Sequence, residues 1–218
     1  MNGFAPRRPL IFDLDGTLID SLPGIASSIG VALRDHPCMV SAEHVRQLIG
    51  PPVREVLRAI AGNLPAIDLD RVEAAFRADY DGKGWRKSEL FPDGQYVVNR
   101  LYKDGFPLYI FTNKPQMAAK RILTELGVHQ LFQAILSKDS RTPFYQSKAE
   151  MLVDLVTQHR LQKSQSIVIG DSHEDLQAAR AMGMQFIFAM YGYGQLSEED
   201  LKGGVGVIHN LNDLLKIL

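Results

Sequence analysis

Five short apolar segments, separated from one another by helical patterns, constrain the fold of this chain more than any other feature. They span residues 9–12, 108–111, 134–136, 167–169 and 186–189. Short apolar runs of this kind are typical of buried strands. From residue 92 onward, amphipathic helical patterns lie between them, and this alternation is typical of a parallel sheet with helices on both faces. The sequence therefore predicts an α/β fold.

Two of the connecting helices have recognisable ends. The segment 115–126 starts with Pro115, which suits the first turn of a helix, and it is followed by Gly127, a common C-terminal cap. A second helix is expected over about residues 175–182, before Gly183.

Residues 21–87 interrupt the alternation. This stretch shows no strand pattern but four amphipathic helical segments, at 25–33, 42–49, 53–60 and 72–80. Ser41 is expected to cap the second of them. We therefore predict two domains: an α/β core formed by residues 1–20 and 88–218, and an inserted α-helical domain formed by residues 21–87.

Composition limits the partners and the compartment. With 24 Lys+Arg against 25 Asp+Glu, the net charge is −1, which gives no field that would attract nucleic acid or an acidic membrane surface. The longest apolar runs fall short of the ~20 residues of a membrane-spanning helix. Arg7 and Arg8 are not followed by the apolar region of a secretory signal, and the single cysteine, Cys38, has no partner for an internal disulfide. We expect a cytoplasmic protein, monomer or homodimer, that acts on a small molecule.

Carboxylates follow two of the predicted strands. Asp13 and Asp15 come directly after the first, with Gly16 behind them, and Asp171 follows the strand at 167–169. Ligands of open α/β sheets bind beyond the carboxyl ends of the strands. Because Mg²⁺ prefers oxygen ligands, Asp13 and Asp171 could supply two of them. A strand that ends in two solvated aspartates is also a common structural feature without a catalytic role. A longer sequence pattern is needed to distinguish this alternative from a reaction centre.

That longer pattern resembles the haloacid dehalogenase superfamily of aspartyl-phosphate phosphatases. Residues 13–18, Asp-Leu-Asp-Gly-Thr-Leu, look like its first motif, and residues 110–114, Ile-Phe-Thr-Asn-Lys, look like the second. Residues 147–150, with Lys148, look like the third, and residues 167–175, ending in Gly-Asp-Ser-His-Glu-Asp, look like the fourth. Four motifs in order over nearly the whole chain make chance agreement improbable. The resemblance implies a Rossmann-like core.

The resemblance also implies a role for each matching residue. Asp13 would be the nucleophile that takes the phosphoryl group, and Asp15 would be the general acid and base. The resemblance assigns the binding of the phosphoryl oxygens to Thr112, Asn113 and Lys148. Mg²⁺ would be held by Asp13, by the backbone carbonyl of Asp15 and by Asp171, while Asp175 would orient Lys148 or a metal-bound water.

The helical insert resembles the C1-type cap of phosphoglycolate phosphatase-like members, which closes over the site and selects the substrate. Its loop 49–53 contains Gly50 and is flanked by Arg46 and Arg54, which could meet a substrate anion. The alternative, that both arginines are solvated helix residues, is the favoured interpretation.

The favoured function is a magnesium-dependent phosphoric monoester hydrolase acting on a small phosphorylated metabolite. Two alternatives stay open: a phosphoglucomutase-like phosphoryl transfer on the same scaffold, and a non-catalytic binding module. The presence of both Asp13 and Asp15 argues against the second, and the sequence does not name the substrate.

Overall fold

The computed structural model describes residues 7–62 and 65–218, and a six-stranded parallel sheet forms its centre. The strand order is β5-β4-β1-β6-β7-β8. The five predicted strands are confirmed, and the sheet comprises β1 (Leu10–Phe12), β4 (Leu108–Thr112), β5 (Ala134–Ser137), β6 (Ile167–Gly170), β7 (Gln185–Ala189) and β8 (Gly206–Ile208). Because β1 pairs with both β4 and β6, the ends of all three strands meet at one edge.

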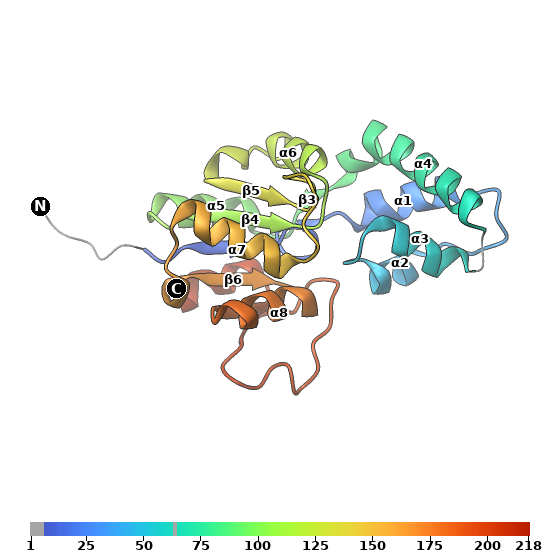
Figure 1. Ribbon diagram of the computed structural model, residues 1–218. Coiled ribbons are helices and arrows are strands. Elements are labelled where there is room, and N and C mark those ends of the chain that lie inside the picture. The colour runs from blue at the N-terminus through green and yellow to red at the C-terminus, as the bar shows by residue number, and fades with distance from the viewer. Residues whose placement is uncertain (1–6, 63–64) are drawn as a thin grey trace, which may run out of the picture.

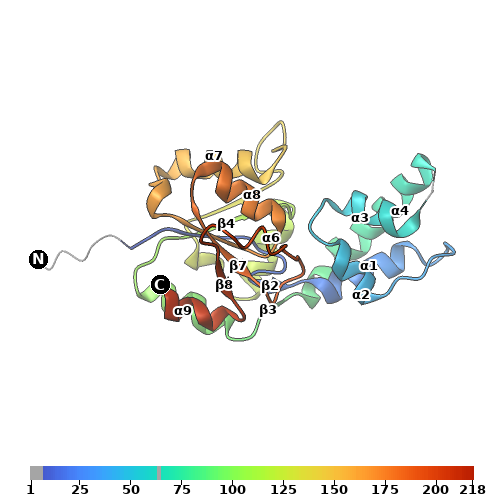
Figure 2. The ribbon, with the colours of Figure 1, turned by 90° about the horizontal axis from the view of Figure 1, so that it is seen from below.

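The two faces of the sheet carry separate apolar cores, because successive side chains of a strand point to opposite faces. Leu10 and Phe12 belong to the core that includes α5 and α6, whereas Ile11 belongs to the core that includes α7 and α8. Figure 2 shows α7 and α8 on one side of the sheet and α9 on the other. The helices are α5 (Gly94–Lys103), α6 (Gln116–Glu125), α7 (Lys148–His159), α8 (His173–Met182) and α9 (Leu214–Ile217).

Four helices from the interrupting segment lie together beside the carboxyl edge of the sheet (Figure 1). They are α1 (Leu22–Ala32), α2 (Ala42–Leu48), α3 (Val53–Ala61) and α4 (Ala66–Gly82). Ser41 caps α2 as predicted, since its side chain accepts a hydrogen bond from the N–H of His44. The residues of the predicted segment 1–20 are described from Arg7 onward.

The two chain segments that join the helices to the sheet run side by side. β2 (Ile19–Asp20) and β3 (Glu89–Leu90) form a short antiparallel pair, and the turn η1 (Gly84–Lys87) follows α4. The backbones of Gly24 and Gly84 also meet closely, because a Cβ on Gly24 would lie 2.3 Å from the carbonyl oxygen of Gly84. Entry to and exit from the helical segment therefore form one compact junction.

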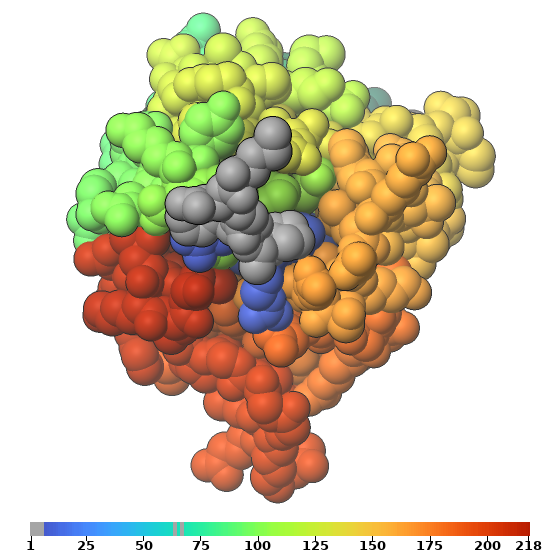
Figure 3. All heavy atoms as spheres, turned by 90° about the vertical axis from the view of Figure 1, so that its left-hand side faces the viewer, coloured from blue at the N-terminus to red at the C-terminus, as the bar shows by residue number. Residues whose placement is uncertain are grey.

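The sequence patterns did not reveal β8. It has three residues and follows a glycine-rich stretch, so its apolar signal is too short to distinguish from a loop. The opposite end of the molecule from α1–α4 is shown in Figure 3, where the first described residues (blue) lie beside the C-terminal segment (red). Within the described residues, every helix is too short or too polar to cross a bilayer.

Candidate active site

The first loop of the site follows β1 at the carboxyl edge of the sheet. Asp13 is buried, and its N–H donates to the carbonyl oxygen of Ile169 in β6 at 2.8 Å. Gly16 has a φ of 84°, and a Cβ there would lie 2.3 Å from Oδ2 of Asp171. Glycine at this position lets the loop that carries Asp13 and Asp15 pass directly against Asp171.

Lys148 begins α7, and its ammonium group lies between two carboxylates. The side chain of Ser147 accepts from the N–H of Glu150 and so fixes the first turn of the helix. The Nζ atom of Lys148 lies 2.7 Å from Oδ1 of Asp13 and 2.6 Å from Oδ1 of Asp175. Burial alone would lower the pKa of this ammonium, but the two carboxylates outweigh it and raise the pKa, so Lys148 is a buried positive charge.

Three buried carboxylates, from Asp13, Asp171 and Asp175, have oxygen atoms within 4.8 Å of one another. Burial raises the pKa of Asp13 well above its ordinary value, and Asp175 and Asp171 add to this effect while Lys148 opposes it. Burial likewise raises the pKa of Asp171 to about 6, and Asp175 adds to the shift. Groups that repel one another in this way are stabilised by a cation, and hard oxygen ligands are those that Mg²⁺ prefers. The donor set therefore fits magnesium.

The hydrogen bonds of these carboxylates distinguish their surroundings. Asp175 accepts from Lys148 and from the N–H of Ser172, and it belongs to the N-terminal capping box of α8. Asp171 follows β6, and its Oδ2 accepts the N–H of Tyr193 at 2.7 Å. All three carboxylates thus accept hydrogen bonds from protein donors. Asp175 holds Lys148 in position, and Asp13 and Asp171 come from the neighbouring strands β1 and β6.

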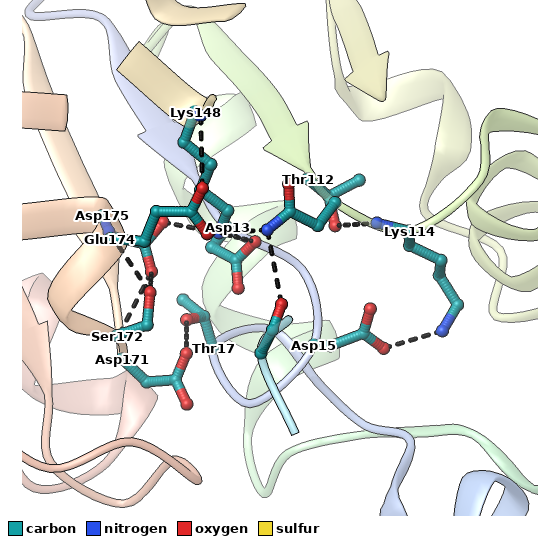
Figure 4. A network of polar contacts seen from close by, with 12 residues as sticks. Asp13, Asp15, Thr17, Thr112, Lys114, Lys148, Asp171, Ser172, Glu174 and Asp175 are labelled. Atoms are coloured by element: carbon teal, nitrogen blue, oxygen red, sulfur yellow. Dashed lines mark hydrogen bonds and ion pairs between the residues drawn. The ribbon is translucent and has the colours of Figure 1, made fainter. Parts of the chain in front are cut away.

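The predicted phosphate-binding residues Thr112 and Asn113 lie where β4 ends. Thr112 is buried, and its hydroxyl oxygen accepts the N–H of Lys114 at 3.1 Å. The amide of Asn113 donates to Oε2 of Glu174 at 2.7 Å and to the carbonyl oxygen of Gly50 at 3.3 Å. Asn113 thus links the core to the loop of the helical segment. Figure 4 shows the surrounding polar network, with Glu174 and Thr112 labelled.

Lys114 is a site residue that the sequence reasoning missed. Its side chain is 4% exposed, and Nζ lies 2.8 Å from Oδ1 of Asp15 and 5.1 Å from the ring centroid of Tyr80 in α4. Burial would lower the pKa of this ammonium, but Asp15 outweighs it and raises the pKa. The site therefore contains two lysine–aspartate pairs: Lys148 with Asp13, which is buried, and Lys114 with Asp15, which is partly buried (Figure 4).

The three predicted residues of the helical segment are placed differently. Gly50 lines the cavity described below. Arg46 and Arg54 are not among the described residues that line it. Arg54 binds Asp70 at 2.6 Å and Glu73 at 2.7 Å, both in α4. The guanidinium of Arg46 donates to the carbonyl oxygen of Gly192 at 2.7 Å. The two arginines hold parts of the protein together in this conformation instead of pointing at the polar residues of the site.

A cavity of about 500 Å³ lies between the sheet edge and the helical segment. Six of the predicted residues reach it from the core: Asp13, Asp15, Thr112, Asn113, Lys148 and Asp171. Gly50 also lines it, whereas Asp175 lies behind Lys148. The buried carboxylate of Asp13, the lysine-paired carboxylate of Asp15 and two lysines beside a carboxylate cluster form a site suited to binding and transfer of an anionic group.

Comparison with known proteins assigns the family. Residues 10–189 match the sequence model of the haloacid dehalogenase-like hydrolases, which covers most of the chain. The chain belongs to this haloacid dehalogenase-like hydrolase family, as its four motifs predicted.

Two curated relatives have different names. Phosphoglycolate phosphatase from Aliivibrio fischeri is 32% identical over 201 residues, which cover 87% of this chain and 87% of the relative. Tyrosine-protein kinase PtkA from Mycobacterium tuberculosis is also 32% identical over 201 residues, which cover 92% of this chain and 68% of the relative.

A solved structure has the same fold. The crystal structure of a predicted phosphoglycolate phosphatase from Haemophilus somnus 129PT matches with a TM-score of 0.87 and 27% identity, covering 99% of both chains. The expected α/β core with a helical insertion is thereby confirmed as the fold of a haloacid dehalogenase-like protein that resembles the phosphoglycolate phosphatases.

Proposed function

We propose that this protein is a magnesium-dependent phosphatase that hydrolyses a phosphoric monoester of a small metabolite through an aspartyl-phosphate intermediate. The observation that carries the proposal is the geometry of Lys148, whose ammonium lies 2.7 Å from Asp13 at the sheet edge, with Asp15 two residues away. A buried carboxylate held beside a fixed positive charge is suited to attack an anionic phosphoryl group. Phosphoglycolate is one candidate substrate, because relatives carry that name.

In the first half of the reaction, a carboxylate oxygen of Asp13 attacks phosphorus, and the bond from phosphorus to the leaving oxygen breaks. Asp15 donates its proton to that oxygen, so the product leaves as an alcohol. Lys148 and the hydroxyl of Thr112 bind the phosphoryl oxygens while their charge is redistributed in the transition state.

In the second half, water attacks the phosphorus of the aspartyl-phosphate. The carboxylate of Asp15 takes a proton from that water, and the bond between phosphorus and Asp13 breaks. Inorganic phosphate is released, and both aspartates return to their starting state. Lys114 holds the Asp15 carboxylate in position at 2.8 Å, so that the same group can serve in both halves.

Magnesium is the cofactor that this donor set suits. Asp13, Asp171 and the backbone carbonyl of Asp15 would hold it, and Asp175 would orient Lys148. The bound ion would supply positive charge that offsets the repulsion among the carboxylates and the phosphoryl group.

The helical segment 21–87 would act as a cap domain on the core formed by residues 1–20 and 88–218. Its loop with Gly50 lies over the site through the contact to Asn113, and its closure would exclude water from the phosphoryl group.

A second candidate function follows from the mycobacterial relative named as a tyrosine-protein kinase, namely phosphoryl transfer to a tyrosine. It would require a nucleotide as the phosphoryl donor. A phosphoglucomutase-like transfer would instead yield an isomerised product. Release of inorganic phosphate from a monoester, with no phosphotyrosine formed in the presence of ATP and no isomer formed, separates the three reactions.

The decisive experiment is Asp13→Asn. An amide has nearly the size of a carboxylate but is a poor nucleophile, so turnover and the trapping of labelled phosphate on the protein should both be lost. Circular dichroism should match that of the wild type. Activity above a trace in a folded variant would show that Asp13 is not the nucleophile.

A further inference from the structure

The cavity has a polar floor, which comes from the core, and a largely apolar wall, which comes mainly from the helical segment. The floor is formed by charged and hydroxyl groups of the core, among them Asp13, Asp15 and Lys148. The wall comes from the helical segment, from the loop after α2 and from α3 and α4. Its apolar members include Ile49, Pro51, Pro52, Val53, Val56 and Phe76.

Apart from Lys138, which lines the cavity from the core, the positive charges near this wall are already engaged. Lys114 binds Asp15, and Arg77, which lines the cavity from α4, binds Glu73 at 2.7 Å. Arg54 is likewise held by Glu73. Arg77 is thus the one cation that the described helical segment contributes to the cavity lining, and it is already paired. An anionic group on the leaving part of a substrate would lie against apolar side chains of this wall without an unpaired cation from the wall itself, which is costly.

The size of the cavity also indicates a substrate with a sizeable leaving group. At about 500 Å³ it falls in the range of sites that enclose a complete small molecule, and a phosphoryl group fills only a fraction of it. Phe76 stacks on Tyr80 with ring centroids 5.3 Å apart and an angle of 11° between the planes. Both are buried in the helical segment, so this part of the wall is a packed aromatic surface instead of a flexible charged one.

We propose that the cavity selects phosphate monoesters whose leaving group is predominantly apolar and at least as large as a phenyl ring or a six-carbon chain. The inference rests on the proposed phosphatase function and narrows its substrate class. The floor binds the phosphoryl group that all such esters share, while the wall removes the apolar remainder from water. This selection acts against a short acidic leaving group such as the glycolate of phosphoglycolate.

A series of alkyl phosphates tests the inference. Ethyl, butyl and hexyl phosphate have leaving alcohols of similar acidity, so the chemistry is constant and only the buried apolar area changes. Each buried methylene should raise kcat/KM roughly threefold to fourfold, because its transfer from water contributes about 0.8 kcal/mol. Hexyl and benzyl phosphate should exceed ethyl phosphate at least about tenfold, and 2-phosphoglycolate should not exceed ethyl phosphate.

Substitutions in the wall test whether the wall residues are responsible for this substrate preference. Val53→Ser removes methyl groups from the wall and should lower the ratio of kcat/KM for hexyl over ethyl phosphate at least about threefold. Phe76→Leu should lower the same ratio. Val40→Ser is the matched control, because Val40 is a half-buried valine of the helical segment that lies outside the cavity lining, and it should leave the ratio unchanged. A ratio is independent of the fraction of folded protein.

The outcomes separate the two proposals. Absence of hydrolysis for every ester would overturn the phosphatase function, and this inference with it. Hydrolysis with equal kcat/KM across the alkyl series, or with 2-phosphoglycolate above hexyl phosphate, would overturn the substrate class alone. If 2-phosphoglycolate were the better substrate, a residue of the core would have to bind its carboxylate, and Lys138 lines the cavity from the core.

Discussion

The ammonium group of Lys114 lies 2.8 Å from the carboxylate of Asp15, and the ring of Tyr80 covers it from the helical segment. Asp15, the proposed acid and base, is thus held by Lys114 of the core, which in turn contacts Tyr80 of α4. The orientation of the Asp15 carboxylate therefore depends on both the core and the helical segment.

Lys114→Met should therefore impair protonation of the leaving group. We expect kcat for an alkyl phosphate to fall by about 10- to 100-fold, but kcat for p-nitrophenyl phosphate to fall much less, because nitrophenolate leaves without a proton. Lys114→Arg should retain more activity than Lys114→Met, and Lys120→Met, an exposed lysine of α6, serves as the control. An equal loss on both substrates would mean that Lys114 is only a structural residue.

Removal of the metal should abolish turnover. EDTA is expected to stop hydrolysis, and Mg²⁺ is expected to restore it, whereas Ca²⁺ should not, because calcium favours six to eight ligands in loose geometry. A binding measurement independent of activity is the rise in Tm on addition of Mg²⁺, which Asp171→Asn should remove. Full activity with calcium, or an unchanged Tm response in Asp171→Asn, would contradict the proposed metal site.

The ion pairs of Glu73 should make the stability of the helical segment depend on pH. Burial raises the pKa of Glu73, but Arg54 and Arg77 outweigh it, and the net pKa is lowered. A lowered pKa means that the stabilisation is present above the ordinary value of 4.5 and is lost as the pH falls through the folded-state pKa. Glu73→Gln should thus lower Tm by about 1–3 °C at pH 7 and have little effect at pH 3.

Glu55→Gln, on the exposed surface of α3, is the control for this substitution. A Tm difference between Glu73→Gln and the wild type that stays constant from pH 3 to pH 7 would argue that the ion pairs contribute nothing to stability.

Arg46→Ala should affect all substrates alike. Arg46 donates to the carbonyl oxygen of Gly192, and its guanidinium lies 5.8 Å from the ring centroid of Tyr193, so it fastens α2 to the loop after β7. Losing a hydrogen bond from a charged group costs about 1.5–3 kcal/mol. We expect lower kcat/KM for ethyl and hexyl phosphate by the same factor. A decrease in kcat/KM for only one of the two esters would instead indicate that Arg46 binds the substrate.

Local patterns predicted most of the scaffold and the polar floor of the site. Asp13 and Asp171 follow apolar strands and Thr112 ends one, and parallel strands bring their carboxyl ends to one edge, so the proximity of the three residues followed from position alone. The cap of α2 at Ser41 was readable because it depends on neighbouring residues.

Contacts between distant segments were the part that the sequence did not reveal. A lysine after a strand is normally solvated, and only the fold encloses Lys114 between Asp15 and Tyr80. The two-residue spacing of Thr112 and Lys114 repeats that of Asp13 and Asp15, and this was the signal available for it. Arg54 seemed free beside its loop because its partner Glu73 lies on another helix.

The pairing of Ile19 with Leu90 and of Asp20 with Glu89 has a consequence for the plasticity of the chain. Two strands that are already hydrogen-bonded fix the distance between the ends of everything between them. The entropy of closing the intervening loop grows only slowly with its length, by about 0.6 kcal/mol for each doubling. The length of the inserted segment therefore has little effect on the entropy of forming this pair, so that segments of different length can be joined to the same sheet at these two positions.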